Sequence, residues 1–584
     1  MKGRGGLAAE AAVRLSKQLL DRDCNLDVVK LTTAALGKHP ASARLWFYLG
    51  TAQRKLERML AARQAYEQAI AIDPNYSQAY CNLGEWYLTQ EEPAVALEHF
   101  DRALELQHDL LEALKNRASA LYKLGRFADA QLAMLMAIAI YPRAAELYIS
   151  IGGVLLDSTK TLPAIASDIE RLITASSYNE ALANIALGVF HHNQIPEKSH
   201  THQYLYCPEF DRQIQKLSDV LVASSASVAT QPHRDNTLII ATEMYKIGGH
   251  TRLIADIARE VHSPTVVLTG LFGSSHRKTP RSPDILLDTF EHAPVIALPQ
   301  GSLWDKCRAL SLLTQRLQPS NILYFNHHQD AIPFVGTLGH VGSRKTLIHH
   351  CDHCPSLGNS LAGIFHVDVT DERAQTCARH LIRETRVLPL YVPDAGEKRF
   401  THLRNNAFSV VTSGSPIKFV RTGEMALQNI VHAVLTSVSG QFFHIGQIEE
   451  DWIYEIKIYL QRNGIDPIRY VQLGWVDSLW DKLASLDAHF YLGSAPVGGG
   501  RAAIEAQGCG YPVIFFRNEP GSVLAVDSLF ASKQLGWTTL AELSALLRAI
   551  GSQQMHLSEQ ARSFYDQCYS REKFVKVLNE ILIY

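Results

Sequence analysis

The stretch "SAPVGGGRAAIEAQGCGYPVIFF" (Ser494–Phe516) joins a glycine turn to a helix-forming segment and then to a short apolar run. Gly498, Gly499 and Gly500 come directly before that segment, so they open its first helical turn. Backbone N–H groups at a helix N-terminus attract anions, and glycine lets a phosphate come close to them. The stretch therefore predicts a turn, helix and strand with a diphosphate cradle. The simpler alternative is a tight turn with a surface glutamate.

Apolar runs of strand length surround this stretch and alternate with amphipathic segments, which is typical of a parallel sheet covered by helices. The runs are "TLIIAT", "TVVLTG", "PVIALP", "ILYFNH", "KTLIHH", "HVDVT", "FSVVTSGS", "QFFHIG", "IRYVQLG", "AHFYLGS" and "PVIFF". They fall into residues 236–400 and residues 401–584, and the second set closes with a helical tail. Because such sheets bind ligands outside the carboxyl ends of their strands, we expect two Rossmann-like halves around a cleft.

The first half has a glycine turn of its own. In "MYKIGGHTRLIADIA", Gly248 and Gly249 follow the first strand, and His250 stands at the start of the next helix. A Gly-Gly turn allows backbone N–H groups to approach an anion or a sugar. His250 adds an ionisable group at the same place.

A 34-residue repeat occupies the first third of the chain. Large residues recur in one register, at Trp46, Tyr80, Leu114 and Tyr148. Small residues recur in a second register, at Gly50, Gly84, Ala118 and Gly152. A helical hairpin explains both, because small residues let two helices approach while Tyr66 and Phe100 fill the gap between neighbouring hairpins. The pattern resembles the tetratricopeptide repeat over residues 43–155, with "WFYLG" and "YCNLG" as its opening signature.

The predicted fold class is therefore α plus α/β: an N-terminal tetratricopeptide α-solenoid followed by two Rossmann-like domains. Helical patterns continue to residue 222, so we expect a helical domain over residues 1–222 and a polar linker over residues 223–235. Repeat arrays of this kind present a concave surface that binds peptide or protein. A spacer or an oligomerisation arm is the alternative.

The glycine-helix stretch resembles the donor-binding loop of GT-B glycosyltransferases, a glycine-rich turn followed by "IEAQGCGYPVI". "KIGGHTR" resembles the glycine turn of that family's first domain, and "TSGSPIKFVRTG" resembles the start of its second domain. The resemblance implies an acceptor side in the first half and a donor side in the second. It also implies donor-binding roles for Gly248, Gly249, Lys418, Arg421, Gly498, Gly499, Gly500, Arg501 and Glu505.

Repeats joined to GT-B halves resemble the nucleocytoplasmic protein O-N-acetylglucosamine transferases and their bacterial relatives. This implies a nucleotide-sugar-dependent glycosyltransferase acting on a protein or peptide that the repeat groove holds. Many retaining GT-B members carry an acidic residue eight positions before the helix glutamate, where this chain has Val497, so an inverting reaction is implied. The donor nucleotide is expected to be UDP, with no cofactor or metal. Two alternatives stay open, a surface-polysaccharide glycosyltransferase and a non-catalytic scaffold that binds a nucleotide sugar.

The stretch "HHCDHC" (His349–Cys354) begins in the strand-like run "KTLIHH", so its last four residues fall at the carboxyl end of a strand, facing the cleft. We predict Asp352 and His353 as the general base or the pair that orients it, with His250 as a third catalytic residue. His327 and His328, after the preceding strand, are weaker candidates. Inverting transfer needs such a base beside the acceptor group.

Three other interpretations of "HHCDHC" compete. Zinc sites need about four ligands, and beyond Cys351 and Cys354 only Cys377 and His380 stand near in sequence. A redox dithiol matches no motif here, and histidines satisfied within the core are the simplest alternative. We therefore predict no metal site.

The composition of the chain excludes some classes of binding partner. The 584 residues include 56 Lys and Arg against 58 Asp and Glu, a net charge of −2, so no global field favours nucleic acid or an acidic membrane. The N-terminus lacks a signal-peptide core, and no apolar run is long enough to span a bilayer. Nine scattered cysteines do not suggest a secreted disulfide framework. A cytoplasmic protein is expected.

Overall fold

The structure is a computed structural model of the whole chain. It describes residues 2–22, 24–126, 129–130, 133, 137, 162–194, 207–224, 236–244, 249–271, 290–299, 301–349, 356–381, 384–398, 400, 407–496, 498, 500–518 and 526–583. Much of the third repeat unit and nearly all of the predicted linker therefore lie outside the described residues. Among the described helices, none combines the length and the apolar character that crossing a bilayer requires.

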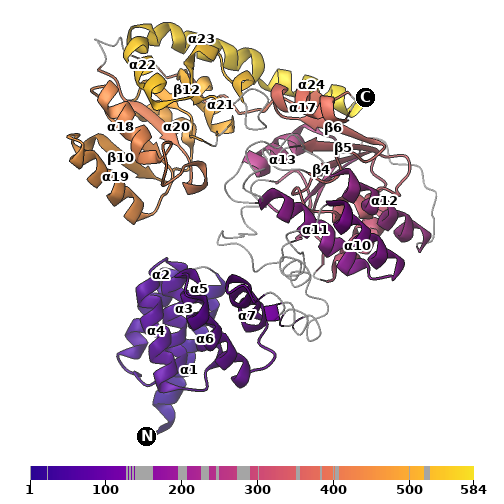
Figure 1. The fold of residues 1–584 in the computed structure, drawn as a ribbon, viewed down its shortest axis with the longest axis vertical. Coiled ribbons are helices and arrows are strands. Elements are labelled where there is room, and N and C mark those ends of the chain that lie inside the picture. The colour runs from indigo at the N-terminus through magenta and orange to yellow at the C-terminus, as the bar shows by residue number, and fades with distance from the viewer. Residues whose placement is uncertain are drawn as a thin grey trace.

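Antiparallel helices form the N-terminal part, as the 34-residue period predicts (Figure 1). They are α1 (Lys2–Asp21), α2 (Asn25–Leu36), α3 (Ala43–Lys55), α4 (Met59–Ile72), α5 (Ser77–Thr89), α6 (Pro93–Leu106) and α7 (Leu111–Lys123). Helices α3 and α4 form one repeat hairpin, and α5 and α6 form the next. Helices α1 and α2 precede them as a further pair.

In the hairpins α3–α4 and α5–α6, a glycine of the first helix packs against an aromatic ring of the second helix. A Cβ atom added to Gly50 would come within 2.7 Å of the ring of Tyr66, and one added to Gly84 within 2.8 Å of the ring of Phe100. Both contacts join the two helices of one hairpin. The prediction that these rings fill the gap between hairpins is therefore incomplete, although Tyr66 also accepts a hydrogen bond from Asn82 in the next hairpin at 3.3 Å.

Three later helices belong to the first α/β half and not to the repeats. They are α10 (Leu162–Thr174), α11 (Tyr178–Gln194) and α12 (Pro208–Ala223). Ile169, Ile185 and Phe210 share one hydrophobic core with Leu238 and Ile240 of the first strand. The helical domain predicted over residues 1–222 is therefore divided, because an amphipathic pattern shows that a helix has an apolar face but not what covers it.

Seven parallel strands form the first sheet, in the order β3-β2-β1-β4-β5-β6-β7. They are β1 (Thr237–Ala241), β2 (Pro264–Leu268), β3 (Val295–Ala297), β4 (Asn321–Phe325), β5 (Arg344–His349), β6 (Ile364–Asp368) and β7 (Arg386–Val387). The intervening helices are α13 (Gly249–Glu260), α15 (Leu303–Leu317), α16 (Ile332–Thr337) and α17 (Asp371–Leu381). The strand order reverses between β1 and β4, and ligands bind at such switch points.

The second sheet repeats this plan with six parallel strands, in the order β10-β9-β8-β11-β12-β13. The strands are β8 (Val410–Ser413), β9 (Phe442–Ile445), β10 (Tyr470–Gly474), β11 (Phe490–Leu492), β12 (Val513–Phe516) and β13 (Gly536–Trp537). Its helices include α18 (Leu427–Ser437), α19 (Glu450–Arg462), α20 (Leu479–Ser485), α21 (Gly500–Gly508), α22 (Leu540–Ile550) and α23 (Gln554–Cys568). Here the order reverses between β8 and β11.

The last helix, α24 (Arg571–Ile583), returns to the first half. Figure 1 shows it on the side of the molecule that holds β5 and β6. Phe574, Leu578 and Ile581 are buried in one core with Ile348 and Val367. The fold class predicted from the sequence is confirmed: helical repeats precede two parallel-sheet α/β halves, and a C-terminal helix joins those halves.

Candidate functional site

The glycine turn of the second half and Lys418 meet directly. Gly500 is the first residue of α21, and Lys418 ends a short 3-10 helix (Pro416–Lys418) that follows β8. Lys418 Nζ donates a hydrogen bond to the Gly498 carbonyl at 3.1 Å. An ammonium group therefore stands at a helix N-terminus, beside the point where the strand order reverses. Gly499 lies outside the described residues.

A buried histidine forms a hydrogen bond with the loop that carries Lys418. His444 of β9 is fully buried, and its two ring nitrogens contact the Tyr470 hydroxyl at 3.0 Å and the Gly414 carbonyl at 3.2 Å. Because a carbonyl can only accept, Nε2 carries the proton and Nδ1 accepts from Tyr470. Burial lowers the pKa of His444 to about 4. The ring is thus a neutral positioning group near pH 7.

Arg501, the second residue of α21, links the two halves. Its guanidinium donates to Asp256 of α13 at 3.0 Å and to the Tyr391 carbonyl at 2.9 Å. Asp256 is 3% exposed, so this ion pair is largely shielded from solvent. The contact brings α21 and α13, the helices that follow the two glycine turns, into one polar cluster.

Glu505 lies one turn further along α21. Its carboxylate is 3.8 Å from the Arg501 guanidinium. Burial raises the pKa of the Glu505 carboxyl, while Arg501 and Arg252 act in the opposite direction. The predicted donor-binding residues Arg501 and Glu505 therefore interact with each other, and their role toward a donor stays a prediction.

On the first-half side, His250 stands in the first turn of α13. Its Nε2 lies 3.2 Å from the Phe325 carbonyl at the end of β4. The carbonyl fixes the proton on Nε2, so Nδ1 is the basic nitrogen of the neutral ring. Gly249 begins α13, whereas Gly248 lies outside the described residues.

A buried carboxylate orders the strand ends beside His250. Asp330 is fully buried and accepts hydrogen bonds from Thr242 Oγ1 at 2.7 Å and from Thr269 Oγ1 at 2.5 Å. Thr242 Oγ1 also accepts from the His327 backbone N–H at 2.7 Å. Burial raises the pKa of Asp330, and these hydroxyl groups partly offset the effect. Asp330 and the two threonines were not predicted as site residues, although both threonines lie at the carboxyl ends of predicted strands and Asp330 follows another.

Other predicted residues lie elsewhere or cannot be placed. Asp352 and His353 lie outside the described residues. Arg421 is exposed and pairs with α19, at 2.7 Å from Asp451 and 3.3 Å from Glu455. Its predicted contact with a donor remains a prediction. The ring centroids of His327 and His328 lie 3.9 Å apart, just after the end of β4.

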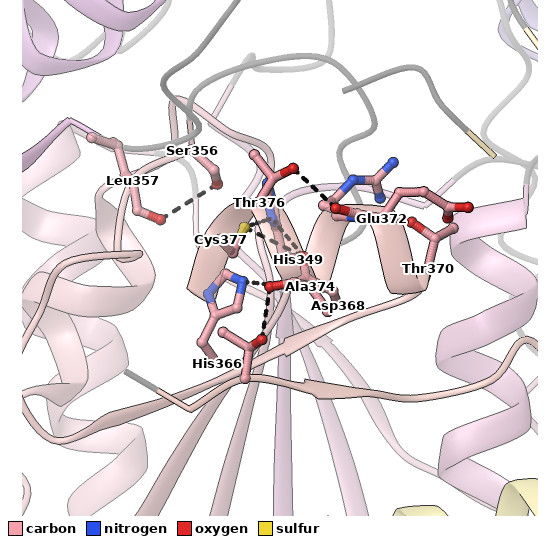
Figure 2. Close-up of polar contacts among 12 residues, drawn as sticks. His349, Ser356, Leu357, His366, Asp368, Thr370, Glu372, Ala374, Thr376 and Cys377 are labelled. Carbon is pink, nitrogen blue, oxygen red and sulfur yellow. Dashed lines mark hydrogen bonds and ion pairs between the residues drawn. The ribbon is translucent and has the colours of Figure 1, made fainter. Parts of the chain in front are cut away.

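The first histidine of "HHCDHC" takes part in a buried polar cluster, which Figure 2 shows. His349 Nδ1 lies 3.0 Å from Asp368 Oδ1, and His366 Nε2 lies 3.0 Å from Asp368 Oδ2. Burial lowers the pKa of His349 to about 4. Burial alone would raise the pKa of Asp368, but hydrogen bonds from both histidines hold it below its usual range. The sequence held one signal for this cluster, since His366 and Asp368, two apart on a strand, share a face.

Comparisons with known proteins identify the repeats. A family model described as TPR repeat matches residues 50–91, and one described as tetratricopeptide repeat matches residues 81–145. Protein FlbA of Caulobacter vibrioides is 27% identical over 157 residues, which is 27% of this chain and 26% of FlbA. Protein O-mannosyl-transferase TMTC3 of Homo sapiens is 27% identical over 162 residues, 27% of this chain and 18% of that protein. The match thus spans about a quarter or less of these relatives.

Solved structures similar to the chain include glycosyltransferases. A point mutant of O-GlcNAc transferase from Thermobaculum terrenum has a TM-score of 0.49 at 13% identity, over 100% of this chain and 98% of that one. HepE of Anabaena, in complex with UDP and glucose, has a TM-score of 0.45 at 15% identity, over 60% of this chain and 99% of that one. A glycosyltransferase from Rickettsia africae has a TM-score of 0.45 at 12% identity, over 60% of this chain and 98% of that one. Scores and identities this low do not carry an activity across.

The matched repeats and the two sheets together define the architecture. Residues 50–145 carry tetratricopeptide repeats, and two Rossmann-like halves, each built on a parallel sheet, follow them.

Proposed function

We propose that the chain is a nucleotide-sugar-dependent glycosyltransferase that acts on a protein acceptor. The observation that carries the proposal is the contact of Lys418 Nζ with the Gly498 carbonyl at the N-terminus of α21. A lysine ammonium has three donor hydrogens, so it can hold this carbonyl and still reach the phosphates of a donor. The glycine turn supplies backbone N–H groups at the same point.

This arrangement suits the departure of a nucleoside diphosphate, which we take to be UDP. Negative charge builds on the leaving phosphate as the glycosidic bond breaks. A fixed cation and a helix N-terminus stabilise that charge without waiting for solvent to reorganise. Lys418 and α21 would supply both from the protein, so the transfer step itself needs no metal ion.

The acceptor group needs a base on the opposite side. We propose His250 for this role, together with Asp352 and His353. Nδ1 of His250 is the basic nitrogen once Nε2–H is held by the Phe325 carbonyl. The ring stands at the start of α13, and Arg501 of α21 binds that same helix through Asp256. Val497 in place of an acidic residue supports inversion at the sugar carbon.

The repeats would recruit the acceptor. Helical hairpin arrays bind extended peptides along a concave face, and at least two complete hairpins precede the α/β halves. The concave face of the repeats therefore favours a protein acceptor. If the acceptor were a surface polysaccharide, the repeats would only recruit partner proteins. If the chain were a non-catalytic scaffold, His250 would have no catalytic role.

A transfer assay tests the proposal. The full chain is incubated with a panel of nucleotide sugars and cell extract, and released nucleotide and modified proteins are measured by mass spectrometry. We expect one donor to be consumed and its sugar to appear on protein. His250→Ala should slow transfer about 10²-fold or more, the usual contribution of a general base. His556→Ala is the matched control, because His556 is exposed on α23.

The outcomes separate the alternatives. Donor consumption with sugar found only on glycans would favour a polysaccharide enzyme. Donor binding with neither transfer nor hydrolysis would favour a scaffold and would contradict the proposal. Equal transfer rates for His250→Ala and wild type would remove His250 from the mechanism and leave Asp352 and His353 as the base.

A further inference from the structure

Four potential metal ligands converge beneath α17, at the carboxyl edge of the first sheet. His349 ends β5, His366 and Asp368 lie on β6, and Cys377 lies on α17. One ligand atom from each residue can be chosen so that all four lie within 4.8 Å of one another. Figure 2 shows the four side chains pointing toward a common centre. Three separate elements therefore deliver these groups to one point.

Two spacings within the cluster match those around a tetrahedral ion. Bonds of about 2.0–2.3 Å to zinc place neighbouring ligand atoms about 3.3–3.8 Å apart. Cys377 Sγ lies 3.6 Å from His349 Nδ1 and 3.7 Å from Asp368 Oδ1. The two nitrogen-to-oxygen distances, both 3.0 Å, would widen by a few tenths of an ångström.

Within the part of the chain that the structure describes, the Asp368 carboxylate is contacted by histidine and cysteine side chains. Asp368 is fully buried, and both of its carboxylate oxygens receive their described hydrogen bonds from His349, His366 and Cys377 and not from lysine or arginine. Burying a carboxylate is unfavourable unless a positive charge compensates it. Arg373 acts on His349 through space and helps to lower the pKa of that histidine. A divalent cation would supply the compensation.

The ligand types select the metal. Two imidazoles, one carboxylate and one thiolate form a mixed nitrogen, oxygen and sulfur set that suits zinc, whereas magnesium and calcium prefer oxygen ligands alone. All four side chains are at most 1% exposed. Four protein ligands in a closed site leave no position for water or substrate, which distinguishes a structural zinc site from a catalytic one.

We propose that His349, His366, Asp368 and Cys377 bind one structural Zn²⁺ that ties β5, β6 and α17 together. Binding would convert the thiol to a thiolate and release its proton to solvent. The ion would fix the last residue of β5, directly before residues 350–355. This differs from the CxxC interpretation of "HHCDHC", because the sulfur comes from α17 and not from Cys351 or Cys354. It is also independent of the transfer chemistry.

Metal analysis of the full chain tests the proposal. The protein is expressed with added Zn²⁺, freed of any affinity tag and passed through a desalting column before elemental analysis. We expect about one zinc per chain, as a closed four-ligand site predicts. After chelation and refilling with Co²⁺, tetrahedral coordination should give visible d–d bands and a thiolate-to-cobalt charge-transfer band.

Matched cysteine variants assign the sulfur ligand. Cys377→Ala removes the thiolate by a small change, so it should lose the charge-transfer band and most of the zinc. Cys307→Ser alters another fully buried cysteine of the same half and should keep both. The double variant Cys351→Ser/Cys354→Ser should keep both as well. Far-ultraviolet circular dichroism checks that each variant is folded.

Several results would overturn the proposal. If the wild-type protein retains no zinc and shows no tetrahedral cobalt spectrum, the four residues form only a hydrogen-bonded cluster. This result does not depend on whether any variant folds. Zinc that survives Cys377→Ala but is lost in the double variant would move the site to the CxxC. Loss in Cys307→Ser to the same degree as in Cys377→Ala would show that the effect is general destabilisation.

Discussion

At the scale of single residues, His444 makes a prediction about pH. Its pKa is lowered from 6.5 to about 4 by burial, so the folded state binds fewer protons than the unfolded state between these values. The stability that the neutral ring contributes is therefore complete above pH 6.5 and is lost as the pH falls toward 4. The loss amounts to on the order of 3 kcal/mol.

His444→Gln checks this, because a glutamine amide can replace both hydrogen bonds but does not titrate. Urea unfolding at pH 7, 6, 5 and 4 should show a steeper loss of stability in the wild-type second half than in the variant. Parallel pH profiles for the two proteins would show that the pKa of His444 is the same in the folded and unfolded states, contrary to the effect of burial.

Individual site residues were predictable only where a local pattern marked them. Lys418 and the glycines stand in motifs, and Lys418 contacts the Gly498 carbonyl, while their role toward a donor stays a prediction. Cys377 could not be linked to His349, because their approach depends on how α17 packs across β5 and β6. Sequence spacing carries no information about that packing.

At the scale of elements, the repeat hairpins make a prediction about their turns. Glu57 and Glu91 occupy equivalent turn positions with φ values of +62° and +61°, and Gly125 occupies the next one at +72°. A residue with a Cβ is strained by about 1 kcal/mol in this left-handed conformation, whereas glycine is not. Glu91→Gly should therefore stabilise the repeats by about 0.5 kcal/mol, the remainder being lost to the greater freedom of glycine in the unfolded chain.

The control variant for this change is expected to lower the stability of the repeats. Glu98→Gly alters an exposed residue inside α6 and should destabilise the repeats by about 1 kcal/mol. Thermal melting followed at 222 nm compares the two variants. A lower melting temperature for Glu91→Gly would mean that the left-handed turn does not exist in solution.

Elements with a strong local pattern were predictable and weak ones were not. The eleven strand-like runs quoted above correspond to strands β1–β6 and β8–β12, and "RVLPLYVPDAGEKR", predicted to hold the last strand of the first half and an exit linker, contains β7. Strand β13 was missed because two residues, Gly536 and Trp537, are too short to show an alternation. Helices α10–α12 were predicted as helices but assigned to the wrong domain, because their partner is a sheet that follows them in the chain.

At the scale of the whole molecule, α24 makes the stability of the first half depend on the C-terminal end of the chain. Phe574 is fully buried in the core that contains Ile348 and Val367. Phe574→Ala should destabilise the first half by about 3–5 kcal/mol, although the residue belongs to the C-terminal end of the chain. Ile583→Ala, 77% exposed on the same helix, should have little effect. Equal urea midpoints for wild type and Phe574→Ala would contradict this packing.

Binding of UDP to the full chain tests the central claim most directly, that a nucleoside diphosphate binds where Lys418 meets α21. Calorimetric titration should show saturable binding to wild type. Lys418→Met removes one charge-assisted hydrogen bond and should weaken binding at least about tenfold, whereas Lys457→Met, an exposed lysine of α19, should bind as wild type does. The account is contradicted if UDP does not bind, or if Lys418→Met and wild type bind it equally well.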